Sequence, residues 1–211
     1  MKTLNLGALA RYVTHTVSRF ARHDGGDPQV CDPVRLSDAA NMPDPLCYRN
    51  SDALGLPSFT LQVAFNHTQC MTSPNPNRNA TVLGHDGGRV GYVSYAVSPL
   101  FDRLYLFKIE IDEAFRRQRY GLAIIRYLVS HYQLPLTTIH ELGKSHMFWA
   151  AARHMLAPLG CAITTISFSE MDQEGVRWRH LQPEIDRLEQ MINQRLLAGE
   201  DYASAVGRGL A

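Results

Sequence analysis

Three arginines within four positions, Arg116, Arg117 and Arg119, stand where the sequence changes from an alternating pattern to a helical one. Guanidinium groups donate paired hydrogen bonds that suit phosphate oxygens. The start of a helix adds backbone N–H groups without intrahelical partners and a partial positive charge. Gly121, close to this start, lets a ligand approach the backbone. The pattern predicts an anion site, with pyrophosphate as the expected ligand and a solvated basic turn as the alternative.

The spacing of apolar residues predicts the elements around this turn. The predicted strands cover residues 59–65, 81–97 (a hairpin), 105–111, 136–142 and 161–169. The predicted helices cover residues 120–133, 145–156 and 181–197. In the strand before the arginines, Tyr105, Phe107, Ile109 and Ile111 are expected to share one face. The fold class is therefore α+β (mixed α/β), with a mostly antiparallel sheet flanked by helices.

Composition limits the class of protein. The chain has 211 residues, is 45% hydrophobic and carries a formal net charge of +1. One medium-sized globular domain fits these values, and the near-neutral charge does not favour nucleic-acid binding. The four cysteines are dispersed and form no CxxC pair. We therefore expect reduced thiols and a cytoplasmic location. No apolar run is long enough to span a membrane.

The two ends of the chain differ from its middle. Residues 1–23 combine four Lys or Arg residues and no acid with an apolar stripe. We expect a helix that packs on the domain, and a targeting segment or membrane-surface helix is the alternative. Rich in Asp, Pro and Gly, residues 24–57 are predicted to be loop. The expected organisation is an N-terminal helix and loop (1–56), a core (57–170) and a C-terminal helical extension (171–211).

The arginine turn resembles the acetyl-CoA signature of the GNAT superfamily of N-acetyltransferases, Arg/Gln-x-x-Gly-x-Gly/Ala between a strand and a helix. In the preferred register Arg116 takes the signature arginine, Gly121 takes the second glycine, and Arg119 replaces the first. A shifted register, Gln118-x-x-Gly121-x-Ala123, satisfies the pattern two residues further along. The hairpin and the later strand and helix follow in the family's order, so the resemblance covers roughly residues 57–170.

The resemblance implies a GNAT-like splayed sheet and a donor site for acetyl-CoA, used as co-substrate without a metal. The residues carried over to this site are Ile109, Ile111, Arg116, Arg117, Gln118, Arg119, Tyr120, Gly121, Leu122, Ala123 and Ser145. A primary amine would attack the thioester directly, without a covalent acyl-enzyme. The implied activity is N-acetyltransferase.

Direct attack needs a base for the ammonium proton and a donor for the oxyanion. His140 and Glu141, on the strand at 136–142, are candidate bases, and histidine titrates near neutrality. Tyr105 is a third candidate, because it stands where some family members carry a glutamate. For each of the three, a structural polar group is the alternative.

The departing thiolate also needs a proton. The tyrosine that supplies it in many family members is replaced here by Leu156 or by Trp149, depending on the alignment. Water, His154 or Tyr120 would have to serve instead. This departure motivates an alternative function, a non-catalytic acyl-CoA-binding regulator or interaction module of the same fold.

Three further expectations concern partners. The spacing in "HELGKSH" does not fit the HExxH pattern of a zinc helix, so we expect no metal. The acceptor would be a small-molecule or peptide amine, because no motif indicates a particular substrate. The apolar stripe of the helix at 181–197 is expected to pack against its own domain or against a second subunit in a homodimer.

Overall fold

The computed structural model describes residues 46–48, 54–139, 141 and 143–211. All of them belong to one compact unit, Ala39–Ala211. The helix predicted within residues 1–23 lies outside the described residues.

Seven strands form one sheet, and each strand is hydrogen-bonded to the next one in the sequence. They are β1 (Leu46–Tyr48), β2 (Phe59–Asn66), β3 (Asn77–Leu83), β4 (Arg89–Val97), β5 (Leu104–Ile111), β6 (Leu136–Ile139) and β7 (Ile163–Ile166). β1 to β5 are antiparallel to their neighbours, whereas β5, β6 and β7 run parallel. The predicted α+β class is confirmed. The prediction of loop at 24–57 is wrong at β1, because pairing with the distant β2 decides that segment.

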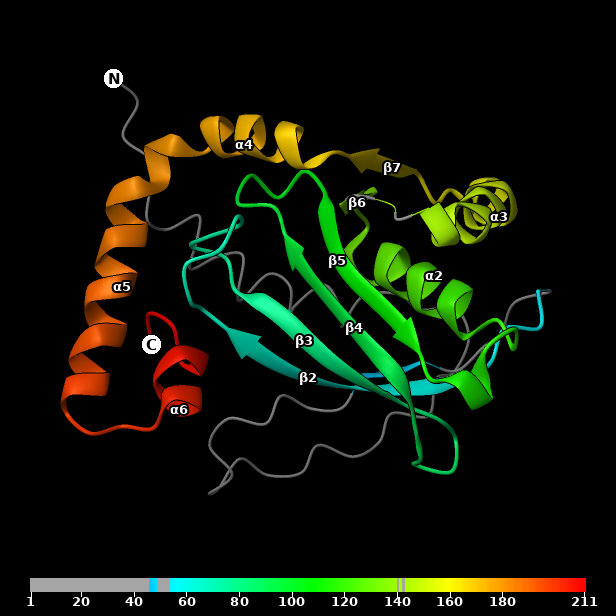
Figure 1. The fold of residues 1–211 in the computed structure, drawn as a ribbon, viewed down its shortest axis with the longest axis horizontal. Coiled ribbons are helices and arrows are strands. Elements are labelled where there is room, and N and C mark those ends of the chain that lie inside the picture. Colours follow the sequence, from blue (N-terminus) through cyan, green and yellow to red (C-terminus); the bar gives the residue numbers. More distant parts are fainter. Residues whose placement is uncertain (1–45, 49–53, 140, 142) are drawn as a thin grey trace, which may run out of the picture. The chain divides into compact units, whose positions relative to one another are not determined.

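Helices connect the parallel strands and extend the chain beyond the sheet (Figure 1). They are α2 (Tyr120–Tyr132), α3 (His146–Leu156), α4 (Phe168–Arg177), α5 (Gln182–Leu197) and α6 (Tyr202–Gly207). Short 3-10 turns are η1 (Glu113–Phe115), η2 (Gly143–Ser145), η3 (Ala157–Leu159) and η4 (Arg179–Leu181). α2, α3 and α5 confirm the three predicted helices. α2 and α3 supply the crossovers that parallel neighbours require.

Within the predicted helical extension at 171–211 the sequence pattern placed one helix, at 181–197, and it did not place α4 or α6. The strand predicted over 161–169 ends at Ile166, and α4 begins at Phe168. None of the α4 side chains is buried, so its apolar residues, such as Phe168 and Val176, do not pack into a core. Its start is set instead by a capping box, in which Ser167 and Glu170 bond each other's backbone N–H groups. α6 has only six residues and begins at an Asp201 cap. Local capping and tertiary packing therefore define these two helices.

The main core lies between the sheet and the crossover helices. α2 runs alongside β5 (Figure 1) and buries Leu122, Ile125 and Leu128, as its spacing predicts. They belong to the same apolar cluster as Leu104 and Leu106 of β5. This packing fixes the first turn of α2 relative to the end of β5.

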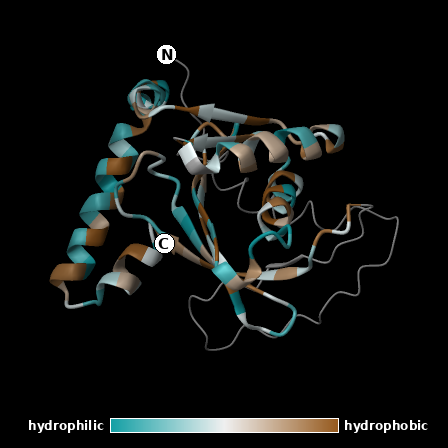
Figure 2. Cartoon of the chain, turned by 45° about the vertical axis from the view of Figure 1, so that its right-hand side comes forward, coloured by the Kyte–Doolittle hydropathy of each residue, from teal (hydrophilic) through white to brown (hydrophobic). Residues whose placement is uncertain are grey.

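The segment Phe168–Ala211, which we call the C-terminal arm, contains α4, α5 and α6. Apolar and polar residues alternate along α5 (Figure 2), and Leu188 and Ile192 form a small cluster with Val206 of α6. The backbone N–H of His67, after β2, donates to the Val206 carbonyl oxygen at 2.9 Å. The stripe of α5 thus packs within its own chain, and the homodimer stays a prediction.

A β-bulge interrupts β5. Ser94 of β4 pairs with Lys108, but the next residue, Tyr95, pairs with Leu106. Phe107 is therefore an extra residue on β5, and one extra residue exchanges the two faces of a strand.

The bulge overturns the predicted shared face of β5. Leu104 and Leu106 before it, and Ile109 and Ile111 after it, belong to the core or pack against it. The side chains of Tyr105, Lys108 and Glu110 lie outside that cluster. Unbroken alternation would have placed Tyr105 with the two isoleucines, and local spacing contains no signal for the break.

Candidate functional site

β5 and β6 separate after three residue pairs. Leu104 to Leu106 pair with residues 136–138 of β6, whereas β5 continues to Ile111. In the described structure no β6 residue pairs with residues 107–111, so this edge of β5 is open. A cavity of about 690 Å³ lies in the opening. Small-molecule sites commonly have volumes of about 300–1,000 Å³.

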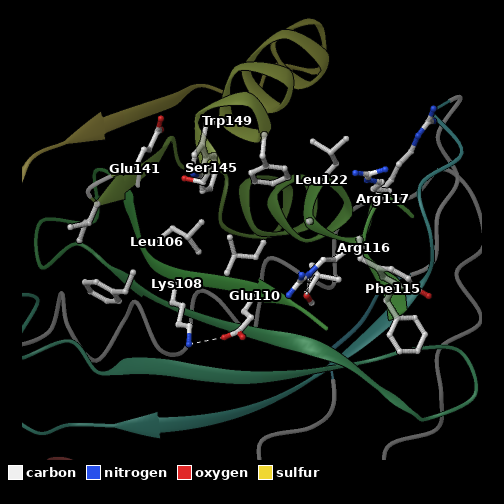
Figure 3. A pocket seen from close by; sticks show the side chains of 18 residues that line it. Leu106, Lys108, Glu110, Phe115, Arg116, Arg117, Leu122, Glu141, Ser145 and Trp149 are labelled. Carbon is white, nitrogen blue, oxygen red and sulfur yellow. Dashed lines mark hydrogen bonds and ion pairs between the residues drawn. The ribbon is translucent and has the colours of Figure 1, made fainter. Parts of the chain in front are cut away.

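The cavity has an apolar wall and a basic end (Figure 3). Leu106 and Ile109 of β5, Leu122 of α2 and Trp149 of α3 contribute to the wall. Arg116, Arg117 and Arg119 line the end next to the first turn of α2. The arrangement suits a ligand with an apolar or uncharged arm and an anionic head.

The arginine turn has an unusual backbone. Arg116 is extended, with φ −63° and ψ 153°. Arg117 and Arg119 have positive φ, 62° and 67°. Only glycine adopts this left-handed conformation without a steric penalty. Arg119 is also the N-cap of α2, so the position at which the signature has a glycine has a backbone that favours glycine.

The turn keeps its positive charge available. The three arginine side chains are exposed. Arg116 Nε donates to the carbonyl oxygen of Ile111 at 3.1 Å, and Arg119 Nη1 donates to that of Leu54 at 2.7 Å. The first turn of α2 contains no acidic residue, so its partial positive charge is not neutralised locally. An anion could bind here to backbone N–H groups and guanidinium groups together.

Most of the predicted donor-site residues meet at the cavity. Its lining includes Ile109, Ile111, Arg116, Arg117, Arg119, Tyr120, Gly121, Leu122 and Ser145. Gln118 and Ala123 lie outside the lining. The Gln118 side chain donates to the Ala114 carbonyl oxygen at 3.0 Å and so stabilises the turn, and Ala123 is fully buried in the core.

Gly121 has a packing role in this structure. A Cβ at this position would lie 3.0 Å from two atoms of the Phe148 ring. The missing side chain therefore lets α3 approach the first turn of α2. In the structure, the Phe148 ring makes the close approach to Gly121 that the sequence predicts for a ligand.

Of the two predicted bases that the structure describes, Tyr105 and Glu141, the cavity lining includes Glu141. Its carboxylate accepts hydrogen bonds from Thr138 Oγ1, at 2.9 Å, and from two guanidinium nitrogens of Arg153. Only 15% of its side chain is exposed. Glu141 is therefore held in a fixed position with both oxygens engaged. His140 lies outside the described residues.

Tyr105 lies away from the cavity lining. Its hydroxyl donates to Glu174 of α4, and its ring packs edge-on against Trp178. Burial and the bond to Glu174 raise the pKa of the phenol. The group is thus a hydrogen-bond donor at neutral pH, and it anchors the C-terminal arm to the sheet.

Neither residue that could replace the tyrosine of the GNAT pattern supplies an acidic proton. Leu156 is buried in the core, and Trp149 lines the cavity without an acidic proton. Tyr120 lines the cavity and is half-buried, whereas His154 is exposed and lies outside the lining. Of these two candidate proton donors, Tyr120 is the one that lines the cavity.

Sequence reasoning missed Lys108 and Glu110, which line the cavity from β5. Lys108 Nζ lies 2.7 Å from Glu110 Oε2 (Figure 3), with 59% and 49% of the two side chains exposed. The hydrogen bond between them lowers the pKa of Glu110 and raises that of Lys108. Their two-residue spacing was visible in the sequence, but their place at the cavity depends on the bulge and the open edge.

No protein-family model matches this chain, and neither does any curated protein. A solved structure, the crystal structure of nourseothricin acetyltransferase, is similar to 42% of this chain at 18% identity and a TM-score of 0.25. The alignment spans 65% of that chain.

Metal-binding clusters and membrane-spanning helices are both absent from the described residues. No group of three or more His, Cys, Asp or Glu side chains there could hold a metal ion. Within the same ranges, none of the helices has the length and hydropathy needed to cross a membrane.

Proposed function

We propose that this protein is an acyl-CoA-dependent N-acyltransferase that moves an acetyl group from acetyl-CoA to a primary amine. The observation that carries the proposal is the cavity at the open edge of β5, with three arginines and a helix N-terminus at one end. Acetyl-CoA joins an anionic pyrophosphate to an uncharged arm, which is the chemistry that such a cavity suits. The resemblance of the turn to the GNAT signature points to the same donor.

The residues present suggest how the donor would be held. The arginine turn and the N–H groups at the start of α2 would bind the pyrophosphate. The unpaired edge of β5 offers backbone N–H groups for the arm and for the oxyanion. The amine nitrogen would form a bond to the thioester carbon, and the carbon–sulfur bond would break. The amine would lose a proton to a base, and the thiolate would take one from Tyr120 or water.

Titration calorimetry with acetyl-CoA tests the donor site. Arg116→Ala removes one charged hydrogen-bonding group, so we expect affinity to fall about 10- to 100-fold, or about 1.5–3 kcal/mol. Gly121→Val should weaken binding because its side chain would crowd the Phe148 ring, which lines the cavity. Arg187→Ala is the matched control, because this exposed α5 arginine pairs with Glu184 outside the cavity lining.

Thermal melting of each variant checks that it is folded. Acetyl-CoA binding by the wild type that Arg116→Ala weakens and Arg187→Ala does not would support the donor site. Binding that none of the variants changes, or no binding at all, would refute it. Binding without turnover on any amine would favour the alternative of a non-catalytic acyl-CoA-binding module.

A further inference from the structure

Two polar rows cross the face of the sheet that points away from the main core. In the first row Asn79 of β3 is paired with Ser94 of β4, which is paired with Lys108 of β5. The second row, one step along the strands, contains Thr81, Tyr92 and Glu110. Cross-strand partners on one face have neighbouring side chains. Both rows end at the cavity, because Lys108 and Glu110 line it.

Hydrogen bonds within the rows orient Asn79. The hydroxyls of Tyr92 and Ser94 both donate to Asn79 Oδ1, at 2.8 Å. With Oδ1 in this position, the two N–H groups of Nδ2 are not used by Tyr92 or Ser94. The first row therefore presents an amide donor and the Lys108 ammonium, both suited to a carboxylate. The second row ends in the Glu110 carboxylate, suited to an ammonium.

The ion pair between Lys108 and Glu110 is exchangeable. Both side chains are about half exposed, and such pairs contribute little to stability because water solvates each charge. A ligand with one positive and one negative group could replace both partners, so that neither charge loses a counter-ion. A polyamine offers positive groups alone and would meet the Lys108 ammonium.

From this charge arrangement we propose that the amine acceptor is an α-amino acid, with its carboxylate bound by Lys108 and Asn79 and its ammonium bound by Glu110. The inference rests on the proposed N-acyltransferase function and adds its substrate class. An α-amino acid separates its two charges by a single carbon, and this short spacing matches neighbouring side chains at adjacent rows.

The chemistry balances with Glu110 as base. The α-ammonium gives one proton to the Glu110 carboxylate, and the free amine attacks the acetyl carbon. A carbon–nitrogen bond forms and the carbon–sulfur bond breaks. The thiolate takes a proton from Tyr120 or water and leaves as CoA-SH, and the attacking nitrogen returns its second proton to that donor. The products are an N-acetyl amino acid and free CoA, with one proton released to solvent when Glu110 returns to its charged form.

The test compares amino acids with their decarboxylated amines. Lysine and 1,5-diaminopentane, tyrosine and tyramine, and histidine and histamine are matched pairs, and the remaining common amino acids complete the panel. Release of CoA-SH gives the rate, and mass spectrometry identifies the acetylated product. We expect at least one amino acid to exceed its decarboxylated amine about 10-fold in kcat/KM, equivalent to about 1.4 kcal/mol.

Variants assign the preference to the rows. Lys108→Met should reduce the preference for the carboxylate about 10-fold while acetyl-CoA still binds, and Lys108→Arg should retain it. Arg187→Met is the matched control, since this exposed α5 arginine pairs with Glu184 outside the cavity lining. Asn79→Leu should raise KM for the amino acid more than it changes kcat.

Three results would overturn the inference. The first is that every decarboxylated amine in the matched pairs reacts as well as its amino acid, and the second is a preference that Lys108→Met leaves unchanged. The third is no turnover of any amino acid by wild-type protein that binds acetyl-CoA, and this result leaves the donor site standing. Failure of the wild type to bind acetyl-CoA would instead remove the proposed function and this inference with it.

Discussion

The positive φ of Arg119 leads to a prediction that needs no ligand. Arg119→Gly and Arg119→Ala both remove the guanidinium group and its bond to the Leu54 carbonyl oxygen. The loss of that bond therefore cancels between the two variants. What differs is the backbone, because φ is 67° at this position and alanine retains the steric penalty that glycine avoids. We expect the glycine variant to be the more stable of the two.

The size of the difference follows from two opposing terms. The left-handed conformation costs alanine about 1–2 kcal/mol. Glycine has more freedom to lose on folding, which costs it about 0.4–1 kcal/mol. The net preference for glycine is about 0–1.6 kcal/mol, with a central value of about 0.8 kcal/mol. At roughly 2–4 °C per kcal/mol for a chain of this size, the central value corresponds to a Tm difference of about 2–3 °C.

Urea unfolding of the two variants measures the difference directly. Arg116 supplies the matched control, because its backbone is extended, with φ −63°. At this position Arg116→Ala should be more stable than Arg116→Gly by about 0.4–1 kcal/mol. The glycine variant should thus be the more stable of the two at position 119, and the alanine variant the more stable at position 116. The same order at both positions would refute the backbone geometry described for the turn.

Three further predictions concern stability. Gly91→Ala would bring a Cβ to 2.2 Å from the Glu110 carbonyl oxygen, so urea unfolding should show a loss of about 1–3 kcal/mol; an unchanged midpoint would contradict the close pairing of β4 and β5. Gly175→Ala lies within α4, where no atom beyond its chain neighbours and the adjacent backbone of the helix lies within 4 Å of the new Cβ. Thermal melting should therefore show a gain of about 0.5–1 kcal/mol, and a loss would argue against the helix. Burial of Asp102 opposes ionisation, but hydrogen bonds, including one from Arg177, lower its pKa overall. Its contribution to stability is therefore complete above its unfolded pKa of about 3.9 and is lost as pH falls through the lower folded value; Asp102→Asn should reduce the acid dependence of urea unfolding, and an identical pH profile would count against the ion pair.

Much of the site could be anticipated from local patterns. The arginine turn, Gly121 and the stripe of α2 are neighbours along the chain, so their spacing alone indicates a basic strand-to-helix junction. The hairpin between β3 and β4 was equally local, because a tight turn depends on a few adjacent residues. The structure contains these predicted features because local conformation and tertiary packing favour the same arrangement at each of them.

The remaining features depend on contacts between distant segments. The bulge at Phe107 exists only as a mismatch between two strands, and it moves Glu110 to the cavity while Tyr105 turns toward α4. The open edge of β5 likewise depends on where β6 ends. The sequence determined which residues could do chemistry, because it contains the residue types themselves and because the local helical or strand period depends only on neighbours along the chain. Tertiary structure decided which of them meet, because strand pairing joins residues whose separation in the sequence contains no signal of contact.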